Sequence, residues 1–219
     1  MTQRPTSREV VLARIRSALA GAPEAPEVRR DYRDSHVPAA PDTLLELLHT
    51  HLADYRAVVH RTPEAELPAL VARLLRDKRA HQVVVPPGLP PAWLAEAEVR
   101  QLADVPDPLT PKRLDAADAV VTGCAVAVAE TGTLVLDGGP GQGRRALTLV
   151  PDLHLCVVRA PDQVVPSVPA ALRRLDPRRP LTWISGPSAT SDIELSRVEG
   201  VHGPRDLQVV LVESGRPGT

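Results

Sequence analysis

The chain has 219 residues, of which 43% are apolar, and its formal net charge is −1 at pH 7. These values are typical of a globular protein with one sizeable core, and a second full domain would be a tight fit. The near-neutral charge and the aromatic content of 2% indicate no nucleic-acid surface. No apolar run approaches the roughly 18 residues of a membrane span, and the N-terminus lacks the apolar core of a secretory signal, so we expect a cytoplasmic protein.

The first predicted element is an amphipathic helix over residues 6–20. Thr6 and Glu9 have the spacing of a capping box, and the apolar side chains that follow share one helix face. The prolines within residues 21–41 indicate a linker. We therefore expect residues 1–41 to form a helical arm that packs on the domain or on a neighbouring subunit of a homo-oligomer. A membrane-binding or targeting helix is the alternative.

Helices and strands alternate after this arm. Helices are expected over 43–54, 62–75, 91–97 and 162–175, and strands over 57–60, 82–85, 119–122, 133–136, 146–149, 153–158, 181–184 and 208–212. The first of these helices is expected to begin with a second capping box, Thr43 and Glu46. The pattern predicts an α/β domain over residues 42–215, with a mixed, largely parallel sheet flanked by helices and an antiparallel part within 133–158.

The cysteines and histidines show no spacing typical of a metal site. Cys124 and Cys156 belong to no Cys-x-x-Cys unit, so the chain by itself supplies no four-cysteine zinc or iron–sulfur site. Both lie in or beside apolar stretches and are expected to be buried free thiols. His49 and His51 cannot share a helix face. We therefore predict no metal ligands and no cofactor held by this chain.

A turn rich in hydroxyls and glycine follows the apolar run 181–184. Its sequence, SGPSATSDIE, predicts a tight turn and then the start of a helix, whose free N–H groups and dipole can hold a phosphate or carboxylate. The ordinary explanation for Asp192 and Glu194 is that acidic side chains stabilise a helix N-terminus. The predicted anion-binding residues are Gly186, Ser188, Thr190, Ser191 and Asp192.

A second polar cluster, Glu130-Thr131-Gly132, lies at the mouth of the strand predicted over 133–136. Ligands of parallel α/β sheets gather beyond the carboxyl ends of strands, so this turn is a second candidate. Thr131 and Gly132 are predicted to bind the ligand. Glu130 is predicted to act as a general base or as a nucleophile toward an acyl group. The alternative is that Glu130 only accepts hydrogen bonds from turn amides.

Two further groups complete the candidate site. The glycine-rich segment 137–145 matches no P-loop and is more simply a hairpin connection, but it ends in Arg144 and Arg145. Either guanidinium can bind a carboxylate or phosphate through two nitrogens, and Arg145 is predicted to do so. His202 lies between glycines and is a candidate for proton transfer, with a structural role in the turn as the alternative.

Four segments together resemble the LUD-domain family, and within it the lactate utilization protein C branch: AETGTLVL (129–136), RALTLVP (145–151), ISGPSATSDIE (184–194) and GVHGP (200–204). The resemblance covers residues 43–213. It implies the fold of the sugar-phosphate isomerase and coenzyme A transferase superfamily, and a bacterial cytoplasmic protein needed to oxidise L-lactate to pyruvate. It further implies two partner proteins, at least one of which carries iron–sulfur clusters, while this chain carries none.

Three hypotheses about function follow. The first is a cluster-free subunit of a lactate-oxidising system that binds an anion between turns 130–133 and 186–192, with His202 nearby. The second is a stand-alone enzyme, similar to an acyl or coenzyme A transferase or a folate ligase, that uses Glu130 as nucleophile or base. The third is a non-catalytic assembly module whose N-terminal arm docks on a partner.

Overall fold

The structure, a computed structural model, describes residues 6–21, 27–37, 40–190, 198–199 and 203–213. The chain divides into two units, Met1–Arg33 and Asp34–Thr219. The first contains helix α1 (Ser7–Leu19). The hydroxyl of Thr6 accepts the N–H of Glu9, and the carboxylate of Glu9 accepts the N–H of Thr6 at 2.7 Å. The predicted capping box is therefore confirmed.

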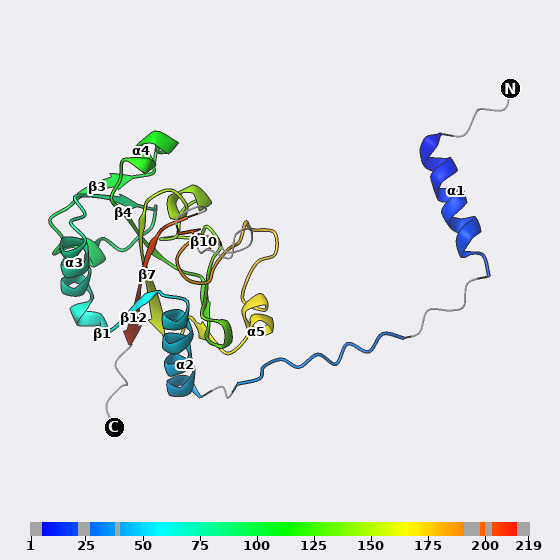
Figure 1. Cartoon of the computed structure of the whole chain (residues 1–219), viewed down its shortest axis with the longest axis horizontal. Coiled ribbons are helices and arrows are strands. Elements are labelled where there is room, and N and C mark those ends of the chain that lie inside the picture. The colour runs from blue at the N-terminus through cyan, green and yellow to red at the C-terminus, as the bar shows by residue number, and fades with distance from the viewer. Residues whose placement is uncertain (1–5, 22–26, 38–39, 191–197, 200–202, 214–219) are drawn as a thin grey trace. The chain divides into compact units, whose positions relative to one another are not determined.

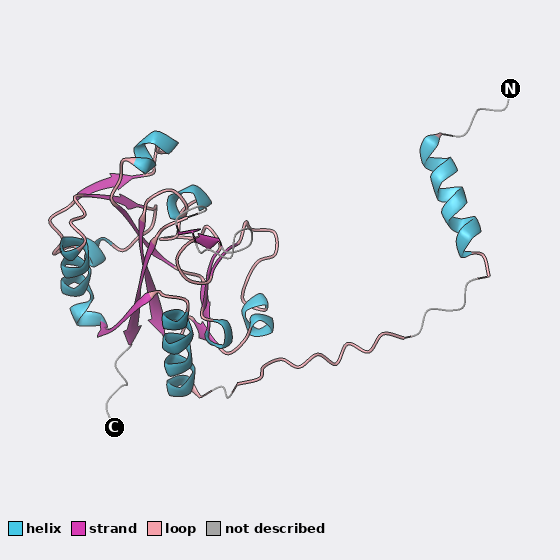
Figure 2. Cartoon of the chain, viewed as in Figure 1, coloured by secondary structure: helices cyan, strands magenta, loops and turns pink. Residues whose placement is uncertain are grey.

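The second unit contains the α/β domain (Figures 1 and 2). Its helices are α2 (Pro41–Asp54), α3 (Leu67–Asp77), α4 (Pro111–Asp115) and α5 (Val168–Leu172), with 3-10 turns η1 (Glu64–Glu66), η2 (Pro91–Leu94), η3 (Ala129–Thr131) and η4 (Arg145–Thr148). Its strands are β1 (Val58–Pro63), β2 (Gln82–Val85), β3 (Arg100–Ala103), β4 (Ala119–Gly123), β5 (Val126–Val128), β6 (Thr133–Leu136), β7 (Leu153–Ala160), β8 (Val164–Val165), β9 (Thr182–Ile184), β10 (Ala189–Thr190), β11 (Val198–Glu199) and β12 (Asp206–Glu213). None of the helices in the described part of the chain combines the length and apolar character that crossing a membrane requires.

The main sheet has six strands in the order β1-β12-β7-β4-β2-β3, and every neighbouring pair is parallel. Side chains of β7 alternate between two buried clusters. Leu155 and Val157 pack with α3, whereas Cys156 and Val158 pack with α2. The two helices therefore cover opposite faces of the sheet (Figure 1), as predicted for a largely parallel sheet.

A second sheet packs on the face that α2 covers. Its order is β8-β5-β6-β9, and β6 runs antiparallel to both of its neighbours. Ala127 and Leu134 of this sheet share one buried cluster with Cys156 and Leu211 of the main sheet. Antiparallel pairing is therefore present, but it joins residues 133–136 to 126–128 and 182–184 in a sheet of its own. The other strands predicted within 133–158 do not take part, since 146–149 fall mostly in η4 and β7 is parallel to its neighbours.

Several predicted elements are wrong in type or start. Residues 146–149 form most of the 3-10 turn η4 instead of a strand, because a short apolar run fits a buried turn equally well. The single helix predicted over 162–175 is replaced by β8 and the short helix α5, whose first turn contains Pro169 and is capped by the hydroxyl of Ser167.

Helix α2 begins at Pro41, and Ala40 precedes it without a side-chain cap. Thr43 therefore lies inside the helix and forms no capping box with Glu46, since proline at the first helical position already sets the backbone for a helix start. The linker also ends earlier than predicted. Asp34 accepts hydrogen bonds from Ser167 and Arg173, so the second unit includes residues that were assigned to the arm.

Candidate functional site

Two of the predicted turns meet through a chain of hydroxyls. Strands β6 and β9 are antiparallel neighbours, and Leu134 is paired with Ile184, which brings the start of β6 to the end of β9. Thr131 Oγ1 lies 2.8 Å from Thr133 Oγ1, and Thr133 Oγ1 lies 2.8 Å from Ser185 Oγ. The turn at 130–133 and the turn at 185–188 are therefore adjacent, as the first hypothesis requires.

Both glycines of these turns lie against the C-terminal end of α2. Gly132 has a φ of +58°, and a Cβ there would lie 2.7 Å from the carbonyl carbon of His51. Gly186 has a φ of +82°, and a Cβ there would lie 2.5 Å from the carbonyl oxygen of Tyr55. Close approach of two backbones thus accounts for glycine at both positions without a ligand. His51 Nδ1 also lies 2.8 Å from the carbonyl oxygen of Ala129, which ties η3 to α2.

A pocket of about 480 Å³ lies beside the second turn. It is bounded by η4, by β9 with the turn after it, and by the amino ends of β7 and β12. We expected ligands beyond the carboxyl ends of strands, so the pocket occupies the opposite edge of the main sheet. Its lining combines polar and apolar side chains: Arg145, Thr148, Leu149, His154, Leu181–Ser188, Gly203, Pro204 and Leu207.

The two adjacent arginines have different roles. Arg144 forms an ion pair with Asp104 (Nε to Oδ2, 2.8 Å) and donates to the carbonyl oxygen of Leu109 at 2.6 Å. Burial alone would raise the pKa of Asp104, but hydrogen bonds from Arg144 and the Leu109 amide lower it. The guanidinium of Arg145 makes no hydrogen bond or ion pair with any residue that the structure describes, and it borders the pocket. Among the described residues that line the pocket, Arg145 is therefore a cation without a described partner.

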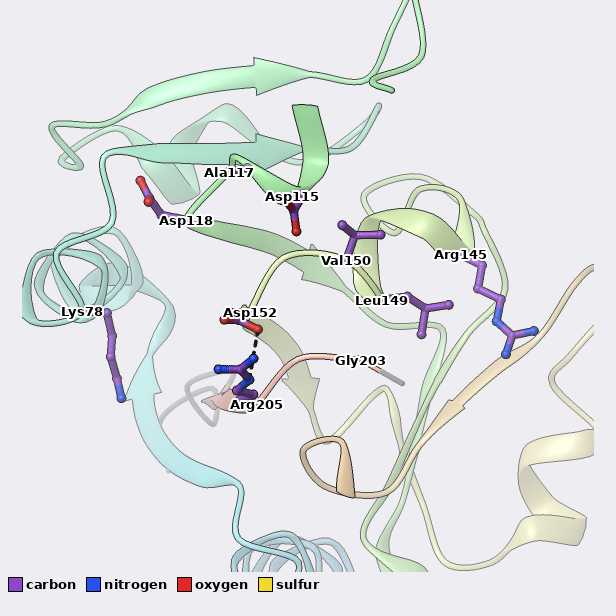
Figure 3. A pocket seen from close by; sticks show the side chains of 10 residues that line it. All are labelled: Lys78, Asp115, Ala117, Asp118, Arg145, Leu149, Val150, Asp152, Gly203 and Arg205. Atoms are coloured by element: carbon purple, nitrogen blue, oxygen red, sulfur yellow. Dashed lines mark ion pairs between the residues drawn. The ribbon is translucent and has the colours of Figure 1, made fainter. Parts of the chain in front are cut away.

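A larger hollow of about 900 Å³ adjoins the pocket and shares Arg145, Leu149 and Gly203 with it (Figure 3). Its other cations are occupied. Lys78 pairs with Asp206, and Arg205 Nε lies 3.7 Å from Asp152 Oδ1. Figure 3 shows Arg145 apart from the ion pair of Asp152 and Arg205. Arg145 thus stands between the two hollows.

The floor of the pocket contains a histidine that sequence reasoning missed. His154 is fully buried, and its Nε2 lies 2.7 Å from Oγ1 of the buried Thr122. Its Nδ1 is the single buried side-chain N or O atom without a hydrogen-bond partner among the described residues. The signal in the sequence was one polar residue inside the apolar run 153–158, and no motif accompanies it.

Cys156 lies two residues beyond His154 on the same face of β7. Cys124 and Cys156 are buried free thiols, as predicted. A hydrogen bond with Cys124, and then contacts with His154 and Thr122, lower the pKa of the Cys156 thiol, while the same contact and burial raise the pKa of Cys124. The Nε2 atom of the imidazole thus has Thr122 as a partner, whereas Nδ1 has no hydrogen-bond partner among the described residues.

The remaining predicted residues are distributed as follows. Glu130 is half-buried in η3, donates its N–H to the carbonyl of Pro166 at 3.1 Å, and lines neither hollow. Ser188 lines the pocket, and its N–H donates to the carbonyl of Pro204 at 2.8 Å. Ser191, Asp192 and His202 lie outside the described residues.

No helix begins directly after the turn at 185–188. Ala189 and Thr190 form strand β10, which pairs antiparallel with β11, so Thr190 lies opposite Val198. Residues 191–194, where the helix N-terminus and its anion cradle were predicted, lie outside the described residues, so that cradle stays a prediction.

Known proteins resemble this chain over most of its length. The model of the LUD domain matches residues 45–212. A lactate utilization protein C from Deinococcus radiodurans is 48% identical over 97% of this chain and 100% of its own length. One from Halalkalibacterium halodurans is 28% identical over 78% and 80%, respectively. The crystal structure of a DUF162-family protein from Deinococcus radiodurans has a TM-score of 0.66 at 44% identity, covering 80% of this chain and 99% of that chain. The chain belongs to the LUD-domain family.

Proposed function

We propose that this protein serves lactate utilization as a subunit that binds a small carboxylate in the pocket beside η4. Two lines of support converge. Relatives that align with most of the chain are named lactate utilization protein C. The pocket volume of about 480 Å³ also falls within the range of small-molecule sites.

The observation that carries the proposal is the guanidinium of Arg145, which has no partner among the described residues and borders a pocket with polar and apolar walls. A guanidinium binds a carboxylate through two parallel, charge-assisted hydrogen bonds. The hydroxyls of Thr148 and Ser188 line the same pocket, whereas Leu149 and Ile184 offer apolar surface to a carbon chain. An organic acid matches this division better than an inorganic anion, because it has one charged and one apolar end.

Binding measurements test this proposal. Isothermal titration of the purified full chain with L-lactate, pyruvate and inorganic phosphate should show that the organic acids bind. Arg145→Gln should weaken that binding about tenfold or more, because a hydrogen bond to a charged group contributes about 1.5–3 kcal/mol. Arg113→Gln is the matched control, since this arginine is exposed on α4 and borders neither hollow. Equal affinities in the two variants, or no binding by the wild type, would contradict the proposal.

The proposal includes partners that accept electrons. Oxidation of lactate to pyruvate releases two electrons and two protons, and we assign the electrons to iron–sulfur partner proteins, in line with the family resemblance. Anaerobic purification of the tagged chain from its native bacterium grown on lactate should recover iron–sulfur proteins in stoichiometric amounts. Recovery of the chain alone would instead support the stand-alone enzyme.

A further inference from the structure

We infer that His154 is the second ligand-contacting residue of the pocket, where its Nδ1 hydrogen-bonds the oxygen on carbon 2 of a 2-hydroxy- or 2-oxo-carboxylate whose carboxylate is bound by Arg145. The inference rests on the proposed function and specifies its ligand class. In this arrangement His154 distinguishes acids that carry an oxygen on carbon 2 from acids that lack it, and Arg145 binds the carboxylate.

Burial makes the unpaired Nδ1 atom informative. Most buried polar atoms in proteins are hydrogen-bonded, and leaving one unpaired costs about 1–3 kcal/mol. His154 cannot avoid this cost by turning its ring, because its Nε2 is held 2.7 Å from Thr122 Oγ1 and both residues are fully buried. His154 nevertheless borders the pocket. A ligand oxygen that displaces the side chains covering Nδ1 at the pocket floor would supply the missing partner.

The contact between His154 and Thr122 suits both oxidation states of such a ligand. When Nε2–H donates to the hydroxyl of Thr122, Nδ1 carries a lone pair and can accept the hydrogen of a 2-hydroxyl group. When the hydroxyl of Thr122 turns and donates to Nε2, Nδ1–H can donate to a 2-oxo oxygen. One imidazole can therefore bind an alcohol or a ketone at the same place, whereas a fixed donor or acceptor would favour one of them.

The size of the pocket and its apolar lining allow acids with more than three carbons to bind. Leu149, Leu181, Ile184 and Leu207 line it together with the polar groups. A volume of about 480 Å³ leaves room beyond the methyl group of lactate. We therefore expect 2-hydroxy acids with longer apolar chains to bind as well, with the chain against these side chains.

Matched ligands separate the two recognition elements. Propionate has the carbon skeleton of lactate but no 2-oxygen. Wild-type protein should bind L-lactate about tenfold or more tightly than propionate. His154→Gln should abolish this preference while leaving the propionate affinity unchanged, whereas Arg145→Gln should weaken both acids. His60→Gln is the control, because this half-buried histidine bonds Gln208 and does not border the pocket.

A spectroscopic measurement on the wild-type chain keeps the test independent of variant folding. Addition of L-lactate should shift the ¹⁵N resonance of His154 Nδ1, whereas propionate should not. An unmoved resonance together with a lactate preference that survives in His154→Gln would overturn the inference, yet loss of lactate binding in Arg145→Gln would still uphold the proposed function. Absence of binding for every acid tested on the wild type would overturn both.

Discussion

Asp104 is a buried carboxylate that anchors the residue just before η4. It is 4% exposed, pairs with Arg144 and accepts the N–H of Leu109 at 2.8 Å. Arg144 immediately precedes Arg145, so the ion pair with Asp104 also fixes the backbone position from which the Arg145 side chain extends. Asp104→Asn should lower the free energy of unfolding by about 1–3 kcal/mol at pH 7, because one charged acceptor of buried hydrogen bonds is lost. Urea denaturation measures the effect.

The pH dependence gives this prediction a sign. The pKa of Asp104 is lowered in the folded protein, so its stabilisation is complete above the unfolded pKa of about 3.9 and is lost as the pH falls through the lower folded value. The difference between wild type and Asp104→Asn should therefore be constant from pH 7 to about pH 5 and shrink at lower pH. Asp107→Asn, at an exposed position, is the control. A difference that grows on acidification would refute the assignment.

At the scale of single residues, the sequence revealed some pocket residues and concealed others. Arg145, Gly186 and Ser188 were identifiable because charged, glycine and hydroxyl residues cluster in turns. His154 was not, since one histidine in an apolar strand carries no motif. The proposed role of His154 depends on its contact with Thr122, and only the pairing of β4 with β7 brings the two residues together.

The contact between α2 and the turn after β9 shows how elements fix the site. Gly186→Ala should destabilise the domain by about 1–3 kcal/mol, because a positive φ of +82° disfavours a side chain and the new Cβ would meet the carbonyl oxygen of Tyr55. Gly138→Ala separates the two causes, since its φ is +70° but its nearest neighbour would lie at an ordinary 3.7 Å. In thermal unfolding, the melting temperature of Gly186→Ala should lie well below that of Gly138→Ala. Equal losses of stability in the two variants would exclude a contribution from the contact between the new Cβ and Tyr55.

Secondary structure was predictable where a long pattern or a clear boundary existed. The capping box of α1 and strands β2 and β6 agree with the sequence analysis. Helix α3 overlaps the helix predicted over 62–75 but starts at Leu67, because β1 extends to Pro63. Prediction failed at η4 and α5, where short apolar or proline-containing segments suit several conformations. It also failed at β10, because pairing with β11 depends on a partner strand further along the chain.

At the scale of the whole molecule, the pocket results from the packing of two sheets. The main sheet alone would present the amino ends of β7 and β12 at an open edge. The second sheet packs on one of its faces, and β9 with the following turn then lies across from His154 and Leu207. Parallel topology could be predicted from alternating elements, but this second packing could not, since it depends on contacts between distant segments.

The boundary of the domain can be tested by two truncations. The described buried clusters of the second unit include no residue before Val37, so removal of residues 1–33 should leave the melting temperature unchanged. Removal of residues 1–41 also deletes Val37, the contact of Asp34 with Ser167, and its 3.0 Å ion pair with Arg173.

The longer truncation should lower the free energy of unfolding by about 1–3 kcal/mol, because it loses part of one valine's burial and a part-buried hydrogen bond. Calorimetry of both truncations beside the full chain provides the measurement. Equal destabilisation by the two would show that residues 1–33 pack on the domain, as the sequence first suggested for the arm. A stable shorter chain with an unstable longer truncation would place the start of the domain between residues 34 and 41, because only the contacts of that segment distinguish the two.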